Sequence, residues 1–118
     1  MKQTVVFDFD GVIHSYVSGW QGVGVISDPP VKDIDKALKD IHEHYKVCVV
    51  STRCASLEGR VAMINWCVKH DIYQYIDEFC VEKPPAVVYI DDRAICFNGK
   101  PKTLLKKIQD FKPWYQKG

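Results

Sequence analysis

Two aspartates stand two positions apart where an apolar run of the sequence ends. The stretch VVFDFDGVIH places Asp8 and Asp10 directly before a glycine. Side chains alternate along a strand, so both carboxylates would lie on one face, with Phe7 and Phe9 on the other. Close carboxylates repel each other, and such a pair normally shares a proton or binds a cation. Because the spacing alone is also typical of a solvated turn, the rest of the chain must decide between these readings.

Polar side chains follow two further apolar runs, and a lysine precedes the second of these runs. They are Ser51 and Thr52, Asp91 and Asp92, and Lys83. If the runs are parallel strands, all of these side chains converge on one edge of a sheet. Carboxylates suit Mg²⁺, which prefers oxygen ligands and substrate phosphate, while hydroxyl and ammonium donors suit the remaining phosphate oxygens. The set therefore predicts a site for a cation and a phosphate group.

Apolar periodicity predicts the elements that would position these residues. We expect strands at 4–9, 46–51, 75–80 and 86–91, and amphipathic helices at 30–45, 56–70 and 102–111. Strands that alternate with helices favour an α/β fold, a doubly wound, Rossmann-like parallel sheet with helices on both faces. In such a sheet ligands bind at the carboxyl ends of the strands, where the polar residues are expected.

Length and composition favour one globular domain over residues 1–118. The chain is 47% hydrophobic and 26% charged, with no low-complexity tract, so disorder is not expected. The N-terminus enters the first apolar run within a few residues, and no run is long enough to cross a bilayer. We therefore expect a cytoplasmic protein with no membrane partner.

The charge is unevenly distributed, although the net charge is only +1. Residues 100–118 contain six lysines and one aspartate, a net charge of +5, which leaves −4 for the rest of the chain. A basic terminal helix is either a solvated face or a surface for an anionic partner, and the first is more usual. Nucleic acid is not indicated, because aromatic and basic residues do not alternate there.

The chain resembles the haloacid dehalogenase superfamily of phosphatases. The motifs DFDGV, VVST, EKPP and YIDDRA occur in that family's order and span nearly the whole chain. The resemblance implies a haloacid dehalogenase-like fold and a Mg²⁺ cofactor. It also implies the following roles: Asp8 as nucleophile and metal ligand, Asp10 as general acid/base and metal ligand through its backbone carbonyl, Ser51 and Lys83 as phosphate-binding residues with Thr52 beside them, Asp91 as the third metal ligand, and Asp92 as a further ligand or a neighbouring acid.

Members of this superfamily differ in their cap insertions, and both insertion points are short here. Residues 12–30 have room only for a glycine-containing hairpin flap, and residues 53–82 are used by one helix and one short strand. We therefore expect no cap domain and an open cleft, which a second subunit of a homo-oligomer would have to close around a small substrate. Tyr16 and Trp20 in the flap either stack on a base or sugar or simply hold the flap.

The function expected from these features is a Mg²⁺-dependent phosphohydrolase that works through an aspartyl-phosphate. Its substrate would be a phosphorylated small molecule or macromolecule. An alternative is a phosphate-binding domain of the same fold without turnover. A receiver domain is disfavoured, since its phosphorylated aspartate would lie at a mid-chain strand. Arg53 either binds substrate or forms a surface ion pair. We favour a structural partner of an acid over a catalytic role for Arg93, and a loop histidine with no special role over a substrate contact for His14.

Overall fold

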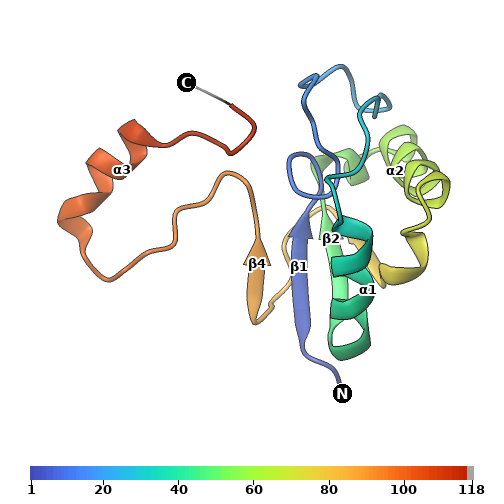
Figure 1. Ribbon diagram of the computed structural model, residues 1–118, viewed down its shortest axis with the longest axis horizontal. Coiled ribbons are helices and arrows are strands. Elements are labelled where there is room, and N and C mark those ends of the chain that lie inside the picture. The colour runs from blue at the N-terminus through green and yellow to red at the C-terminus, as the bar shows by residue number, and fades with distance from the viewer. Residues whose placement is uncertain (117–118) are drawn as a thin grey trace.

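The computed structural model describes residues 1–116, which form a four-stranded parallel sheet and three α-helices (Figure 1). The strands are β1 (Thr4–Asp8), β2 (Lys46–Val50), β3 (Glu78–Cys80) and β4 (Val88–Ile90), in the order β3-β2-β1-β4. The helices are α1 (Ile34–His44), α2 (Leu57–Lys69) and α3 (Leu104–Asp110). The predicted α/β class with a parallel sheet is confirmed. Within residues 1–116, no helix combines the length and the apolar character needed to cross a bilayer.

The register of the central strand fixes which residues meet at the carboxyl edge of the sheet. Strand β1 pairs in parallel with β2 and with β4. Asp8 lies beside Val50, and Phe7 lies beside Ile90. The residues that follow, Ser51 and Asp91, therefore leave the sheet at the level of Asp8. This convergence is what the sequence predicted for the polar residues at the strand ends.

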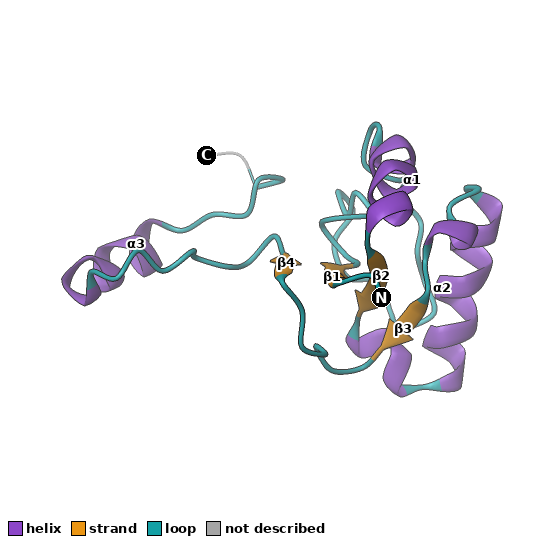
Figure 2. Cartoon of the chain, turned by 90° about the horizontal axis from the view of Figure 1, so that it is seen from below, coloured by secondary structure: helices purple, strands orange, loops and turns teal. Residues whose placement is uncertain are grey.

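Helices α1 and α2 cover the same face of the sheet (Figure 2). The cluster on this face joins Val5, Phe7, Val47 and Val49 of the strands to Leu38, Met63 and Trp66 of the helices. Both helices lie there because β1, β2 and β3 are laid down in one direction, and right-handed crossovers put successive helices on one side.

The second face of the sheet carries a smaller cluster with no helical residue. Val6, Cys48 and Val50 are buried there against Cys80 and Ala86. The chain returns across this face from β3 to β4 through residues 81–87. Two consecutive prolines in this segment disfavour the formation of a helix. Helices on both faces are therefore not found among residues 1–116, and a doubly wound sheet is not confirmed.

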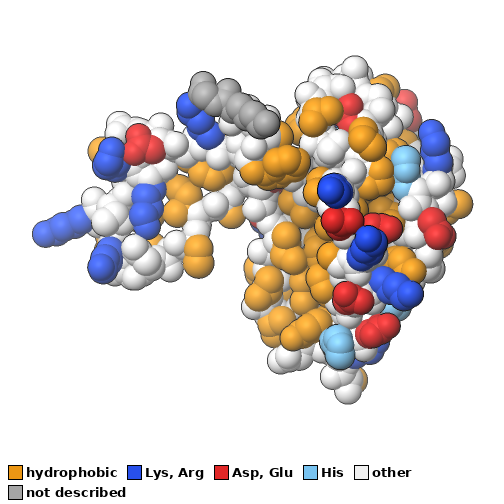
Figure 3. All heavy atoms as spheres, viewed as in Figure 1, with side chains coloured by type: hydrophobic (Ala, Val, Ile, Leu, Met, Phe, Trp, Pro, Cys, Tyr) orange, Lys and Arg blue, Asp and Glu red, His pale blue; other side chains and the backbone are white. Residues whose placement is uncertain are grey.

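Helix α3 forms close to where the sequence predicts it, but it stands apart from the sheet (Figures 1 and 2). The radius of gyration is 15.0 Å, whereas a compact domain of this length has about 13.5 Å. Hydrophobic side chains gather both on the body near β4 and on the arm that carries α3 (Figure 3). Leu105 of α3 is 67% exposed. The predicted closing helix therefore leaves the sheet uncovered.

Two predicted segments differ from the structure for local reasons. The helix expected from residue 30 begins only at Ile34, because Asp33 adopts a left-handed backbone with φ of 66°. The flap at 12–30 contains no paired strands and makes a single antiparallel bridge between His14 and Pro30. Pro29 and Pro30 lack N–H groups, so a ladder of hydrogen bonds cannot extend from this bridge. The flap is a loop, not the hairpin that the sequence suggested.

The helices make unequal contributions to stability, which two leucine substitutions can measure. Leu38 of α1 is fully buried against the sheet, so Leu38→Ala should lower the free energy of unfolding by about 2–5 kcal/mol. The matched change Leu105→Ala, on the exposed α3, should alter it by less than about 0.5 kcal/mol. Urea denaturation measures both values. A large loss for Leu105→Ala would show that α3 packs against apolar surface in solution.

Candidate functional site

Three of the predicted acids come together at the carboxyl edge of the sheet. Asp8 is the last residue of β1, and Asp91 and Asp92 directly follow β4. One carboxylate oxygen from each lies within 4.8 Å of the others. The carboxylate of the fourth acid, Asp10, makes different contacts. The backbone role that the resemblance implies for Asp10 stays a prediction.

Asp92 is the most enclosed of the three clustered acids. Its side chain is 2% exposed, and its Oδ1 atom is buried with no hydrogen-bond partner. Its Oδ2 atom accepts a hydrogen bond of 2.7 Å from the Tyr115 hydroxyl. Gly11, with φ of 89°, passes so close that a Cβ there would collide with this carboxylate. A buried carboxylate oxygen without a partner is costly, and a bound cation would remove that cost.

The environment of Asp8 also favours a cation. Burial, followed by the neighbouring carboxylates of Asp92 and Asp91, raises the pKa of Asp8 to about 7. Without a cation, the cluster therefore retains a proton near neutral pH. Three converging carboxylates at a strand edge are the hard oxygen donors that Mg²⁺ takes. Asp8, Asp91 and Asp92 thus fit a Mg²⁺ ion.

Lys83 lies at the same cluster, as the sequence predicted. Its Nζ atom is 2.8 Å from Asp91 Oδ2, and this hydrogen bond raises the pKa of Lys83. Burial alone would raise the pKa of Asp91, but the hydrogen bonds from Lys83 and from the Arg93 N–H lower it below its usual value. The loop that carries Lys83 is fixed by a 2.7 Å hydrogen bond from the Tyr89 hydroxyl to the Pro84 carbonyl.

The two predicted hydroxyl residues are at this edge but differ in exposure. Ser51 is buried, and its Oγ accepts a 3.1 Å hydrogen bond from the Arg53 N–H. It therefore caps the short helix Thr52–Ala55. Thr52 is exposed. The register pairs Asp8 with Val50, so Ser51 and Thr52 follow the strand residue that lies beside Asp8. Their role in holding phosphate stays a prediction.

Asp10 is held by a histidine and an arginine. Its Oδ1 is 2.8 Å from His14 Nδ1, and its Oδ2 accepts a 2.9 Å hydrogen bond from Arg53 Nε. Burial alone would raise the pKa of Asp10, but these hydrogen bonds and the positive charges behind them lower it. Asp8 and Asp10 are two positions apart, yet their pKa values shift in opposite directions.

Of the two interpretations of Arg53, the surface ion pair is wrong, and substrate binding stays a prediction. Its side chain is fully buried, and besides Asp10 it binds the carbonyls of Gly22 and Val23 in the flap, at 2.9 and 2.7 Å. A sequence signal existed, because Arg53 follows a strand end at the edge where the acids converge. That position favours a partner for an acid over a free surface charge.

His14 is likewise more than a loop histidine. It is 1% exposed, and its Nε2 atom accepts the Asp28 N–H at 3.2 Å. Nδ1 is then the protonated nitrogen and donates to Asp10. The signal in the sequence was the spacing of four residues between Asp10 and His14, which a tight turn after β1 converts into a contact.

The C-terminal segment supplies site residues that sequence reasoning missed. Trp114 Nε1 donates a 2.7 Å hydrogen bond to the Gly11 carbonyl, and Tyr115 reaches Asp92. In Figure 1 this segment returns from α3 to the loop that follows β1. Arg93 lies 4.0 Å from Asp92 and donates its N–H to Asp91, which confirms it as a partner of these acids. No pattern in the sequence predicts a contact between residues more than a hundred positions apart.

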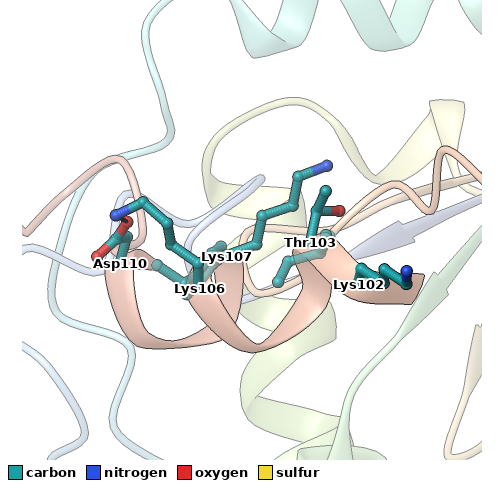
Figure 4. A pocket seen from close by; sticks show the side chains of 7 residues that line it. Lys102, Thr103, Lys106, Lys107 and Asp110 are labelled. Atoms are coloured by element: carbon teal, nitrogen blue, oxygen red, sulfur yellow. Dashed lines mark ion pairs between the residues drawn. The ribbon is translucent and has the colours of Figure 1, made fainter. Parts of the chain in front are cut away.

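A separate hollow of about 670 Å³ lies against α3 (Figure 4). It is lined by the following residues: Ile95, Lys102, Thr103, Lys106, Lys107, Asp110 and Phe111. Lys106 and Asp110 form an ion pair of 2.9 Å at one end. None of the predicted site residues lines this hollow, so it is distinct from the acidic site.

The acid cluster predicts how stability depends on pH and Mg²⁺. Because folding raises the pKa of Asp8 from 3.8 to about 7, its stabilising proton is lost as the pH rises through about 7. In EDTA, urea denaturation should therefore give a lower free energy of unfolding at about pH 8 than at about pH 5. Millimolar Mg²⁺ should restore roughly 1–2 kcal/mol at the higher pH.

Asp8→Asn serves as the test variant, since it removes both the titrating group and a ligand. Its stability in EDTA should change little between these two pH values, and its response to Mg²⁺ should be smaller than that of the wild type. The exposed acid Asp35 of α1 offers a control, Asp35→Asn, that should behave like the wild type. A wild-type protein whose stability is indifferent to Mg²⁺ at both pH values would contradict a metal site at this edge.

Comparison of the chain with protein-family models, with curated proteins and with solved structures found no match. The family resemblance therefore depends on the four short motifs alone.

Proposed function

We propose that the protein is a Mg²⁺-dependent phosphohydrolase that forms an aspartyl-phosphate on Asp8. The observation that carries this proposal is the convergence of Asp8, Asp91 and Asp92 at the strand edge, with Lys83 bound to Asp91. The substrate is a phosphate ester of a small molecule or a macromolecule. A haloacid dehalogenase-like, doubly wound fold without a cap domain, a cytoplasmic location and a second subunit over the cleft belong to the same proposal.

The chemistry proceeds in two displacements at phosphorus. A carboxylate oxygen of Asp8 attacks the phosphorus, the ester P–O bond breaks, and the alcohol leaves with a proton from Asp10. Water then attacks the same phosphorus, the bond to Asp8 breaks, and the proton of the water returns to Asp10. Asp8, Asp91 and Asp92 would hold a Mg²⁺ ion, which would reduce the repulsion between carboxylate and phosphate. The Lys83 ammonium binds a phosphate oxygen, and Ser51 and Thr52 donate to the others.

Asp10 needs a raised pKa to act as the acid. In the free protein, His14 and Arg53 hold its pKa below the usual value. A phosphate dianion bound beside it would act in the other direction, because a neighbouring negative charge disfavours a second one. The contacts with His14 and Arg53 orient the carboxylate until the substrate arrives. Proton transfer by Asp10 is thereby linked to substrate binding.

One observation favours a second candidate, a phosphate-binding domain without turnover. Both carboxylate oxygens of Asp10 already accept hydrogen bonds, Oδ1 from His14 and from Arg53 Nη2 at 3.3 Å, and Oδ2 from Arg53 Nε. While Arg53 maintains these hydrogen bonds, Asp10 stays ionised and acts as a structural group. In that case the site would bind phosphate and Mg²⁺ and release them unchanged.

Asp8→Asn should lower the rate constant for hydrolysis of an aryl phosphate at least about a thousandfold, because an amide cannot attack phosphorus. Steady-state assays with Mg²⁺ measure the rate, and circular dichroism checks the fold. Asp35→Asn on α1 is the matched control and should keep wild-type turnover. Near wild-type turnover by Asp8→Asn would exclude the aspartyl-phosphate route. No turnover by the wild-type protein, with Mg²⁺ binding intact, would favour the second candidate.

Asp10→Asn should lose activity selectively, according to the leaving group. With a sugar phosphate, whose alcohol needs a proton to depart, the rate should fall by about 10²–10⁴. With nitrophenyl phosphate the loss in the first displacement should be much smaller, because nitrophenolate departs unprotonated. Single-turnover measurements on both substrates separate this step from later water attack. Equal losses on the two substrates would remove Asp10 from the acid role.

A further inference from the structure

A cleft of about 300 Å³ opens beside the acidic site and has aromatic walls. Tyr16 and Trp20 of the flap, Tyr115 of the C-terminal segment and the Arg93 side chain line it. Trp20 is 54% exposed, and the Arg93 side chain is 63% exposed. The cleft therefore exposes aromatic faces and a guanidinium group to a ligand that enters from solvent.

Both walls of the cleft are tied to the acids by direct contacts. On one side, the Arg53 Cζ atom lies 4.5 Å from the centre of the Trp20 ring, and Arg53 binds Asp10. On the other side, the Tyr115 hydroxyl donates to Asp92 and accepts from Arg93 Nε at 3.4 Å. A group attached to a phosphate at Asp8, with its leaving oxygen toward Asp10, would extend between these walls.

The walls are held in place before any ligand binds. Tyr16 has a left-handed backbone with φ of 60°, which costs free energy for a residue with a bulky side chain. Its ring packs edge-to-face against Tyr115, with centroids 5.8 Å apart, and also against His14. A strained residue whose ring is fixed from two sides is typical of a binding site. Little ordering cost would then remain for the ligand.

We propose that this cleft binds the nucleoside part of a nucleoside monophosphate whose phosphate lies at Asp8, an inference that rests on the proposed function. Bases stack on aromatic side chains with about 1–3 kcal/mol each. Arg93 adds a flat cation that stacks on a base or binds a sugar hydroxyl. A sugar phosphate without a base has no π face to offer. Hydrolysis would consume water and release the nucleoside and inorganic phosphate.

The test compares adenosine monophosphate with ribose phosphate, which shares the leaving alcohol but lacks the base. The wild type should prefer adenosine monophosphate in kcat/KM by about 5- to 100-fold, mostly through KM, as expected for one stacked base. Trp20→Leu keeps an apolar side chain over Arg53 but removes the aromatic plane. It should abolish the preference by lowering kcat/KM for adenosine monophosphate toward the value for ribose phosphate, while Trp20→Phe should restore most of the preference.

Val25→Ala provides the matched control. Val25 lies in the same flap and is exposed, but it does not line the cleft. This variant should keep both the rate and the preference of the wild type. An adenosine monophosphate preference that survives in Trp20→Leu, or a wild type that does not distinguish the two substrates, would overturn the inference while leaving the phosphatase proposal intact.

Calorimetric binding of the same two compounds in the presence of Mg²⁺ separates the two proposals. If no phosphate ester is hydrolysed, the proposed function fails, but tighter binding of adenosine monophosphate that is lost in Trp20→Leu would still support the cleft. Equal binding of both compounds would reject it. A short oligonucleotide with a terminal phosphate, assayed beside the mononucleotide, distinguishes a free nucleotide from a strand end, since both offer a stacked base next to phosphate.

Discussion

The buried guanidinium of Arg53 holds the candidate site together. It connects three separate segments, because it follows β2, binds Asp10 after β1, and binds two carbonyls of the flap. Gly59 of α2 packs so tightly against the Arg53 carbonyl that no Cβ would fit. A buried charge must be paired and fully hydrogen-bonded, or the structure loses several kcal/mol. The flap is therefore held by this charged group as well as by the apolar packing of Ile13 and Ile26.

This ion pair divides the two aspartates of the first motif into different environments. Asp10 accepts hydrogen bonds from His14 and the Arg53 guanidinium, and its pKa is lowered, whereas Asp8 is buried beside other acids, and its pKa is raised. Groups whose pKa values are driven apart in this way are typical of acid/base pairs. The free protein holds these pKa values in the order opposite to the one that the proposed mechanism needs. Mg²⁺ near Asp8 and a phosphate dianion near Asp10 would each reverse one of the shifts.

Local patterns predicted much of this structure, and long-range contacts explain what they missed. The spacing of apolar residues and the length of the apolar runs predicted all four strands and all three α-helices among residues 1–116, because these signals are contained in a few adjacent residues. The convergence of Asp8 and Asp91 followed from parallel pairing alone. The burial of Arg53 depends on carbonyls about thirty positions away, and α3 stands apart from the sheet although its sequence predicted a closing helix. Neither the burial of Arg53 nor the position of α3 can be predicted from a pattern of adjacent residues.

The contact between Trp114 and Gly11 joins positions 103 residues apart, which gives the site a place in the order of folding. Loop closure over such a distance costs entropy that earlier contacts do not repay, so contacts of this range form late. The β1–β2 and β2–β3 pairs span shorter stretches of chain and can form before the C-terminal segment arrives. A partly folded protein would then have part of its sheet in place but an open edge beside Asp8. The site would then be completed late in folding, after most of the free energy of folding has been gained.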